Sequence, residues 1–513
     1  MFLQKAFYYP LSKRLHALLR IPGFKALLDY EHSRCSDAQI VSDVYDSPAW
    51  QQFMGKPKKP CDRIGLQACT DGFQAYASGT LSLKPIVFSI LSLPPSLRYK
   101  SEFMLLLMFL PTNVKAWGQK KYFDFAARYE LHSLYTRGID GIKVKIFSMS
   151  MDTVGRHELL GMQTSAGYKS ACCICRHEWT APVTGKQCCF AGYRSLLPAQ
   201  SRGRQPRVRV FGETYEYSRT ETRPKPERRT TKSAQESCAV VEALHMPCNG
   251  HKHPPLVANW PGFSWYRFSP PELMHDSKIF VEMLLKTLVG KVQDGGFYGS
   301  WSYDDKHRKE NQILGIFKST WSTDENGPFP WRLSRAQRLL LDERMSTLIW
   351  PEKIEKSYYN GASFWKKPNR IWKAIRKVKL LYFILPTQLR DQVPAVRKAL
   401  YTFVWAMRRM LGQVHSYKEA EEIKILPGSR TFDQTQINLL HAELTMGLSL
   451  LSGCLPVGQL NPGMHHFAHF AEFTKTHGLL HQLWMMGFER CIFDARSLTT
   501  IPIYEHSLSS HTI

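Results

Sequence analysis

The order of apolar stretches in the first third of the chain constrains the fold more than any other feature. IGLQACTDGF (64–73) is a short apolar run that ends on an acid and a glycine, and KPIVFSILSLPP (84–95) is closed by proline. FMLLLMFLP (103–111) is another buried strand or, equally, a core helix segment. Residues 119–137 have helical spacing, and KVKIFSMSMD (143–152) alternates and ends on an aspartate. The order strand–strand–strand–helix–strand predicts an α/β fold.

Two aspartates, Asp71 and Asp152, end the first and the last of these predicted strands. If the two strands are neighbours in one sheet, the two carboxylates converge on one spot. Mg²⁺ prefers oxygen ligands and is commonly held by one or two carboxylates together with waters. A pair of such ions can activate a nucleophile and stabilise the leaving oxygen at a phosphate. The plain alternative is that Asp71 begins a turn and Asp152 caps a helix.

The chain is long and strongly basic. It has 513 residues, 43% of them apolar, and a formal net charge of +25 with a pI near 9.5. A field of this sign favours phosphate contacts and therefore nucleic acid, although a ribosome-like or mitochondrial protein or a plain basic surface also fits. The basic, amphipathic start resembles no secretory signal, while a transit peptide stays open. Because the sequence has no apolar run of about 20 residues, we expect no membrane span. Because the cysteines are dispersed and follow no secretory signal, we expect a reduced, intracellular protein.

The twelve cysteines are dispersed apart from one cluster, and this cluster has metal-ligand spacing. Cys172 and Cys175 form a CxxC that can bind one zinc ion, but a structural site needs four ligands. The candidate partners are all distant in sequence: Cys248, His251, His253 and His275. A redox motif fits less well, because no thioredoxin-like βαβ pattern surrounds it. Small buried cysteines are the remaining alternative.

Two further segments invite a functional interpretation. The histidine-dense stretch 465–481 places His465 and His469 on one helical face, and we expect packing in a helical bundle there rather than metal binding. Residues 200–235 are rich in Arg, Pro and Ser/Thr, which fits a solvated linker as well as a basic arm that orders on DNA. The arginines that would contact the DNA backbone in the second case are Arg202, Arg204, Arg207, Arg209, Arg228 and Arg229.

Eight short motifs, in order from about residue 60 to 490, resemble those of the CACTA-type (En/Spm-like) DNA transposases. TDGF (70–73) resembles the first catalytic motif of that family, and SMDT (150–153) contains the second acid. The other matching stretches are SLPPSLR (92–98), FAARYELHSLYTRGID (125–140), GMQTSAGYKSACCIC (161–175), FAGYRSLLP (190–198), ELMHDSKIF (272–280) and MHHFAHFAEFTKTHGLLHQLWMMGFER (464–490). Each motif alone is weak, whereas eight in order are strong.

The resemblance implies a DDE/D transposase with an RNase H-like fold and Mg²⁺ or Mn²⁺ as cofactor. Its reaction would be DNA cleavage and strand joining at transposon ends in the nucleus. Its partner would be double-stranded DNA, and whether the chain forms a homo-oligomer stays open. Asp71 and Asp152 match the first two acids of the family. Cys172 and Cys175 match its CxxC, with zinc implied, and His275 matches its MH pair.

Departures from the family pattern predict an impaired active site. The family's third acid lies in a KAxEWRxFLLY segment, and the matching stretch 372–386 has Ile375-Arg376 where the glutamate belongs. An arginine cannot ligate a divalent cation. Glu352 or Glu355 could supply the acid from outside the motif. Otherwise the chain is a degenerate or truncated copy, or a non-catalytic DNA-binding or scaffold protein retained by a host.

The predicted organisation has five parts. A helical and polar lead-in (1–60) precedes the first part of the RNase H-like core (61–170), which is interrupted by a Cys-containing, basic insertion (171–260). A largely helical region (261–490) with the DxMH-like and FER motifs follows, and then a tail (491–513).

Overall fold

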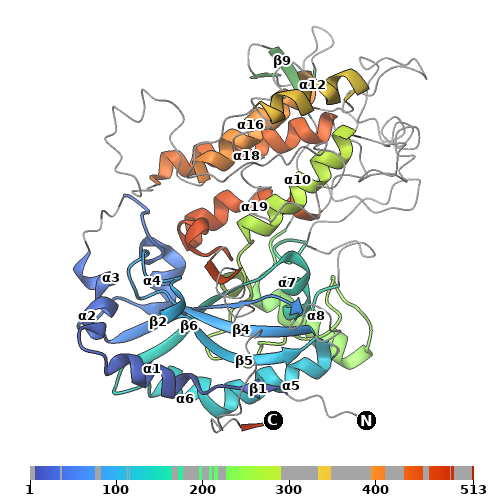
Figure 1. Cartoon of the computed structure of the whole chain (residues 1–513). Coiled ribbons are helices and arrows are strands. Elements are labelled where there is room, and N and C mark those ends of the chain that lie inside the picture. The colour runs from blue at the N-terminus through green and yellow to red at the C-terminus, as the bar shows by residue number, and fades with distance from the viewer. Residues whose placement is uncertain are drawn as a thin grey trace.

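The structure is a computed structural model of the whole chain. It describes residues 6–34, 37, 39–74, 82–112, 114, 116–163, 172–176, 196–198, 207–210, 213–217, 227–289, 333–347, 394–410, 432–454, 462–485, 487–489 and 511–512. Figure 1 shows an α/β body that contains the main sheet, with a layer of long helices above it. In the described parts of the chain, no helix has the length and apolar character needed to cross a membrane.

The main sheet is built around β2 (Arg63–Thr70), whose residues are buried almost throughout. β2 pairs antiparallel with β4 (Ser82–Ile90) and parallel with β6 (Lys143–Ser150). β5 (Leu105–Pro111) extends the sheet beyond β4, so the order is β5-β4-β2-β6, with the short β3 (Phe73–Gln74) also beside β4. The predicted strands are therefore confirmed, and the ambiguous stretch 103–111 forms a strand. The fold class is a mixed α/β fold.

The register of β2 and β6 determines where the two aspartates lie. Cys69 of β2 pairs with Ser150 of β6, and each strand runs in the same direction. Asp71 and Asp152 each follow two residues after this pair, so the two acids leave the sheet at the same edge. The parallel pairing explains why strand ends far apart in sequence converge.

The predicted helix over 119–137 consists of three consecutive parts. α5 (Ala116–Ala126) continues through a π-helical turn, η3 (Ala127–Leu131), into α6 (His132–Thr136). Gly138 follows with a φ of 77°, a left-handed conformation that suits a glycine at a helix end. α6 contacts β6 on one face of the sheet. After β6, the short helix α7 (Thr153–Leu159) begins directly behind Asp152.

Residues 6–60 contain several short helices and also contribute a strand to the sheet. These helices are α1 (Leu11–Leu19), α2 (Phe24–Leu28), α3 (Tyr30–Ser33), η1 (Val44–Asp46) and α4 (Pro48–Met54). The two-residue strand β1 (Phe7–Tyr8) pairs with β5 and with β10 (His511–Thr512). A strand this short has no alternation long enough to be detected in the sequence.

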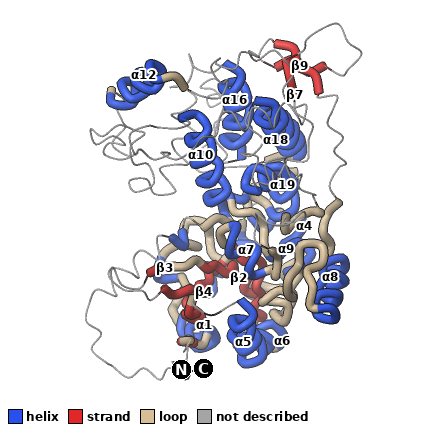
Figure 2. Tube along the Cα trace, turned by 90° about the vertical axis from the view of Figure 1, so that its right-hand side faces the viewer, coloured by secondary structure: helices blue, strands red, loops and turns tan. Residues whose placement is uncertain are grey.

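The remaining elements lie after α7. The basic region contains a small sheet of β7 (Leu196–Pro198), β8 (Arg207–Val210) and β9 (Glu213–Tyr217), followed by α8 (Thr231–Leu244) and α9 (Trp265–Phe268). The helical layer contains α10 (Leu273–Val289), α12 (Arg335–Ser346), α16 (Pro394–Met410), α18 (Gln434–Cys454) and α19 (Pro462–His477), with η6 (Leu480–Gln482) after it. In Figures 1 and 2, α19 lies between the sheet and α16 with α18, and α10 extends upward beside these helices.

Aromatic packing holds three helices of this layer together. The rings of Phe280 on α10, Phe403 on α16 and Phe467 on α19 pack together, with centroid distances of 4.5 to 5.9 Å. All three side chains are fully buried. α19 therefore has a fixed position against α10, and both helices carry side chains that reach the candidate sites.

Candidate active site and metal centre

The edge of the sheet where β2 and β6 end carries a cluster of titratable side chains. Ligand atoms of Asp71, His275 and Glu489 all lie within 4.8 Å of one another. Asp152 lines the same cavity as Asp71, and its charge contributes to raising the pKa of Asp71, although burial is the larger cause and His275 opposes the shift. Three carboxylates and one imidazole therefore share this edge.

The aspartates also serve the local backbone, as the plain alternative predicts. The Asp152 side chain accepts a hydrogen bond from the Gly155 backbone N–H (2.6 Å) and so caps α7. The Asp71 side chain accepts one from Gly72 N–H (2.8 Å). Each of these bonds uses one carboxylate oxygen, which leaves the other oxygen for a different role. Capping and cation binding are therefore compatible here.

Glu489 reaches the cluster because the segment before it is fixed to the sheet. Gln67 and Ser150, on β2 and β6, both donate to the Leu483 carbonyl, at 2.6 and 2.7 Å. The Tyr99 hydroxyl donates to the Gln482 carbonyl next to it. Burial raises the pKa of Glu489, and the neighbouring Asp71 adds to this effect against the opposing charge of His275.

Sequence reasoning looked for the third acid elsewhere. The stretch 372–386, and Glu352 and Glu355, lie outside the described residues. Glu489 belongs to the FER motif that closes the resemblance, so the motif itself was recognised without its glutamate being considered. The signal in the sequence was the FER motif itself, in which Glu489 is the acid.

His275 is oriented by Glu272, which precedes it on α10. Glu272 Oε2 accepts from both the backbone N–H and the Nδ1 of His275, at 2.7 and 2.8 Å. The other oxygen accepts from Met485 N–H (2.9 Å), in the segment that leads to Glu489. Burial lowers the pKa of His275, but the hydrogen bond and charge of Glu272 outweigh it, and the pKa rises to about 9. At neutral pH His275 is therefore a cation among the carboxylates.

A fully buried polar cluster lies directly behind this site. Asp276 accepts from the Thr153 hydroxyl (2.8 Å) at the start of α7 and lies 3.1 Å from His466 Nδ1 on α19. Arg156 of α7 lies 2.9 Å from the same His466 nitrogen and 3.7 Å from the Asp276 carboxylate. This cluster connects three helices, α7, α10 and α19, at a place where no water can compensate for a lost partner.

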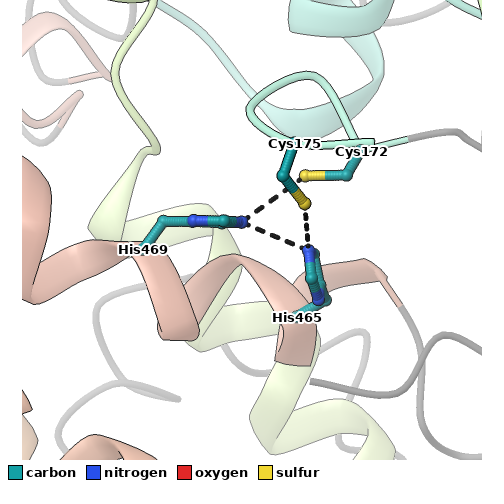
Figure 3. Close-up of side chains that lie close together, drawn as sticks. All are labelled: Cys172, Cys175, His465 and His469. Carbon is teal, nitrogen blue, oxygen red and sulfur yellow. Dashed lines mark hydrogen bonds between the residues drawn. The ribbon is translucent and has the colours of Figure 1, made fainter. Parts of the chain in front are cut away.

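A second candidate site contains the predicted cysteines. Figure 3 shows Cys172 and Cys175 facing His465 and His469 of α19. Cys175 Sγ lies 3.1 Å from His465 Nε2, Cys172 Sγ lies 3.7 Å from His469 Nε2, and the two Nε2 atoms are 3.2 Å apart. All four residues are buried. This buried Cys/His cluster can hold a metal ion.

The donor set and its spacing fit zinc. Bond lengths of about 2.0–2.3 Å in a tetrahedral arrangement separate the ligand atoms by roughly 3.3–3.8 Å, close to the distances observed. The pKa of the Cys172 thiol lies well below its usual value, because hydrogen bonds from Cys175 and His465 and the charge of His465 outweigh the opposing effect of burial. A thiolate is the form that ligates metals.

The histidine-dense stretch has a second candidate role beside the packing that was expected. His465 and His469 of α19 lie next to Cys172 and Cys175, and the four ligand atoms are close enough to one another to hold a metal ion. A spacing of four residues on one helical face fits both roles, so the sequence alone did not separate them. The other proposed partners lie elsewhere: His251 contacts Cys238 (3.6 Å) and Trp265, and His275 belongs to the acidic cluster.

The predicted DNA-contacting arginines fall into four groups. Arg202 and Arg204 lie outside the described residues, and Arg207 and Arg209 lie on β8. Arg228 is 59% exposed and forms an ion pair with Glu472 of α19.

Arg229 differs from the other arginines because it is buried. It donates to the carbonyl oxygens of Cys172 (2.8 Å) and Cys175 (3.2 Å). In this arrangement Arg229 supports the cysteine loop and presents no surface to a phosphate, which corrects its predicted role.

The fold and the two sites together define a mixed α/β protein with acids gathered at one sheet edge and a separate, buried Cys/His cluster. A more particular relationship comes from comparison: residues 39–239 match the family model described as Transposase family tnp2. The match covers about two fifths of the chain and includes Asp71, Asp152 and both cysteines. No curated protein matches the chain. The family match supports a transposon-derived protein related to transposases.

Proposed function

We propose that this chain is a CACTA-type transposase or a protein derived from one, with an RNase H-like core that performs metal-dependent phosphoryl transfer on DNA. The observation that supports this most is the convergence of Asp71, Asp152 and Glu489 at one edge of the sheet, from three distant parts of the chain. With Glu489 as third acid, the centre has the one acid that was missing from the stretch 372–386. We therefore propose an active site that is competent rather than impaired.

In this proposal Asp71, Asp152 and Glu489 would hold Mg²⁺ or Mn²⁺. The ions would supply Lewis-acid activation of a water or 3′-hydroxyl and charge stabilisation at the leaving oxygen of the scissile phosphate. His275 contributes a positive charge and an N–H donor to a phosphate oxygen, and Glu272 fixes the orientation of that imidazole. The hydrogen bonds to the Leu483 and Gln482 carbonyls hold the segment before Glu489 against the sheet, and so keep Glu489 near Asp71.

We propose a structural role for zinc in the Cys172, Cys175, His465 and His469 cluster. All four positions are protein ligands, as in structural zinc sites, whereas catalytic zinc sites keep one position open. The ion would join the cysteine loop to α19 across about 290 residues of sequence. α19 also carries His466 and leads to Glu489, so this ion would stabilise the arrangement of the acidic site.

The net charge of +25 supports double-stranded DNA as the partner. Arg202, Arg204, Arg207 and Arg209 remain the proposed backbone contacts, together with Arg228 once its ion pair with Glu472 opens. A protein that acts on chromosomal DNA works in the nucleus, which we propose as its location.

The test is cleavage of a labelled duplex that carries the inverted repeats flanking the coding sequence, in Mg²⁺ and in Mn²⁺. We expect cleavage by the wild type and a loss of at least about a hundredfold in Asp71→Asn, Asp152→Asn and Glu489→Gln. Glu236→Gln, an exposed glutamate of α8, is the matched control and should cleave like the wild type.

The same variants distinguish the second hypothesis, a non-catalytic DNA-binding protein. That protein would bind the duplex with a strong salt dependence, cleave nothing, and be indifferent to Asp71→Asn. Cleavage that persists in Glu489→Gln would contradict the role proposed for the third acid. A chain that shows neither cleavage nor salt-sensitive binding would contradict both hypotheses.

A further inference from the structure

Asp152 stands apart from the tightest group of the acidic site. That group is Asp71, His275 and Glu489, whose ligand atoms lie within 4.8 Å of one another. Among the described residues, Asp152 does not belong to this group, although it lines the same cavity as Asp71. Whether all three acids can share divalent cations therefore depends on what fixes the distance of Asp152 from the others.

The position of Asp152 is the position of the first turn of α7. The Asp152 side chain accepts from the Gly155 backbone N–H, so its carboxylate moves together with the helix that it caps. Thr153 is the first residue of α7, and its hydroxyl donates to the Asp276 carboxylate on α10 (2.8 Å). Asp276 directly follows His275. One hydrogen bond thus joins the residue after Asp152 to the residue after His275.

Asp276 is a charge at a place where packing alone does not require one. Its side chain is fully buried and lies 3.1 Å from His466 Nδ1 and 3.7 Å from the Arg156 guanidinium. A buried carboxylate is costly unless it is paired and hydrogen-bonded, and well-packed apolar residues often stabilise a core as well or better. The bonds of Asp276 reach α7 and α19 from α10. Their contribution is therefore directional, because they fix how these helices sit against one another.

We propose that Asp276 and Thr153 are positioning residues of the acidic site. Their hydrogen bond sets how far Asp152 lies from the other acids. The inference rests on the proposed function, because it needs a divalent cation held by these acids. Without the bond, α7 keeps its fold, but its first turn is free to shift. A metal site tolerates displacements of only about 0.5 Å in its ligands, so a shift of that size weakens the binding of the cation.

The variant that tests this bond is Thr153→Val, which exchanges the hydroxyl for a methyl group of similar size. Thr153→Ser keeps the donor and is the conservative variant. The matched control is Thr474→Val on α19. Thr474 is also buried, but its hydroxyl donates to the Phe470 carbonyl of the same helix (2.9 Å), so this bond joins no two elements.

The first measurement is the binding of Mn²⁺ to the protein without DNA, followed by the electron paramagnetic resonance of the free ion. The Cys/His cluster is first loaded with zinc. Thr153→Val should raise the dissociation constant of Mn²⁺ about tenfold, the lower end of the range for groups that orient metal ligands. Thr153→Ser and Thr474→Val should bind Mn²⁺ like the wild type.

The second measurement separates metal binding from the reaction itself. Thr153→Val should need about tenfold more Mg²⁺ for half-maximal cleavage of the end duplex. Its rate at saturating Mg²⁺ should stay within about threefold of the wild-type rate. A merely structural role would instead lower the midpoint of thermal unfolding in both valine variants and leave the Mg²⁺ requirement unchanged.

Three results would overturn the positioning role while the wild type still binds Mn²⁺ and cleaves, and the proposed function would then stand. These are Mn²⁺ binding by Thr153→Val that equals that of Thr474→Val, a rate that falls at saturating Mg²⁺ with an unchanged dissociation constant, and a Thr153→Ser variant as weak as Thr153→Val. If the valine variant does not fold, Thr153→Ala with Thr474→Ala as its control decides the same question. A wild type that neither binds Mn²⁺ nor cleaves the ends overturns both proposals.

Discussion

Arg98 is a fully buried cation whose removal should destabilise the fold strongly. It lies in the SLPPSLR motif, and its guanidinium donates to the Asp43 carboxylate (2.9 Å) and to the Leu93 carbonyl (2.8 Å). Its side chain has no exposed surface, and that of Asp43 is 3% exposed. Asp43 lies in the lead-in and Arg98 follows β4, so the pair connects two separate parts of the body.

Removing one member of such a pair leaves the other charge buried without compensation, which costs about 3–5 kcal/mol. Arg98→Met should therefore lose about this much in the free energy of unfolding, and so should Asp43→Asn. The double variant removes both charges and should lose no more than either single variant. With a urea slope of about 3 kcal/mol per molar, each single change shifts the unfolding midpoint by roughly 1–2 M.

Urea unfolding followed by tryptophan fluorescence measures these four proteins, with the exposed Arg20→Met as a control expected to lie within about 0.5 kcal/mol of the wild type. Two results would refute the reasoning. One is a loss below about 1 kcal/mol in Arg98→Met, and the other is a double variant whose loss equals the sum of the single ones.

Three further predictions concern the metal centre, the pH dependence and a glycine. Cys175→Ser should retain less zinc after dialysis than the wild type, as measured by mass spectrometry of the metal content. Burial lowers the pKa of His477 to about 4, so as the pH falls the unfolded chain takes up the proton before the folded one does. The free energy of unfolding should therefore fall by about 1.4 kcal/mol per pH unit as the pH is lowered from 6.5 to 4. His477→Gln should reduce that slope in urea titrations. Gly161→Ala should destabilise by more than about 1 kcal/mol in the same assay, because φ is 67° and a Cβ would lie 1.9 Å from the His253 carbonyl oxygen.

The sheet could be predicted because its signals are local. Each of the long strands β2, β4, β5 and β6 has an apolar run in the sequence, and an acid, glycine or proline follows or closes that run. The two-residue strands have no such signal. The approach of Asp71 and Asp152 followed from one further assumption, that the first and last strands are neighbours, and the parallel pairing of β2 with β6 confirms it. The metal role of these two acids remains a prediction.

The rest of the candidate site depends on contacts that no local pattern encodes. His465 and His469 are one helical turn apart, a spacing that serves core packing as readily as ligation. Only the position of α19 against the cysteine loop distinguishes the two roles. Glu489 was missed for a similar reason, because its approach depends on Gln67 and Ser150 holding the Leu483 carbonyl. The sequence gives no sign that two strand residues bind a loop more than 300 residues later.

Because both clusters need residues from the second half of the chain, we expect the segment that matches the transposase family to form neither site by itself. Residues 39–239 contain two acids and two cysteines, while the other half of each cluster, Glu489 with His275 and His465 with His469, lies after them. A CxxC without further ligands holds zinc weakly, since a structural site needs four. A chain ending at residue 461 should therefore lose stoichiometric zinc and cleavage together. Glu489→Gln should lose cleavage and keep zinc. Cys175→Ser should lose zinc, and its cleavage should fall only as far as the loss of the ion displaces α19. If the shortened chain cleaves DNA at the wild-type rate, the acids of this sheet edge do not act as one site.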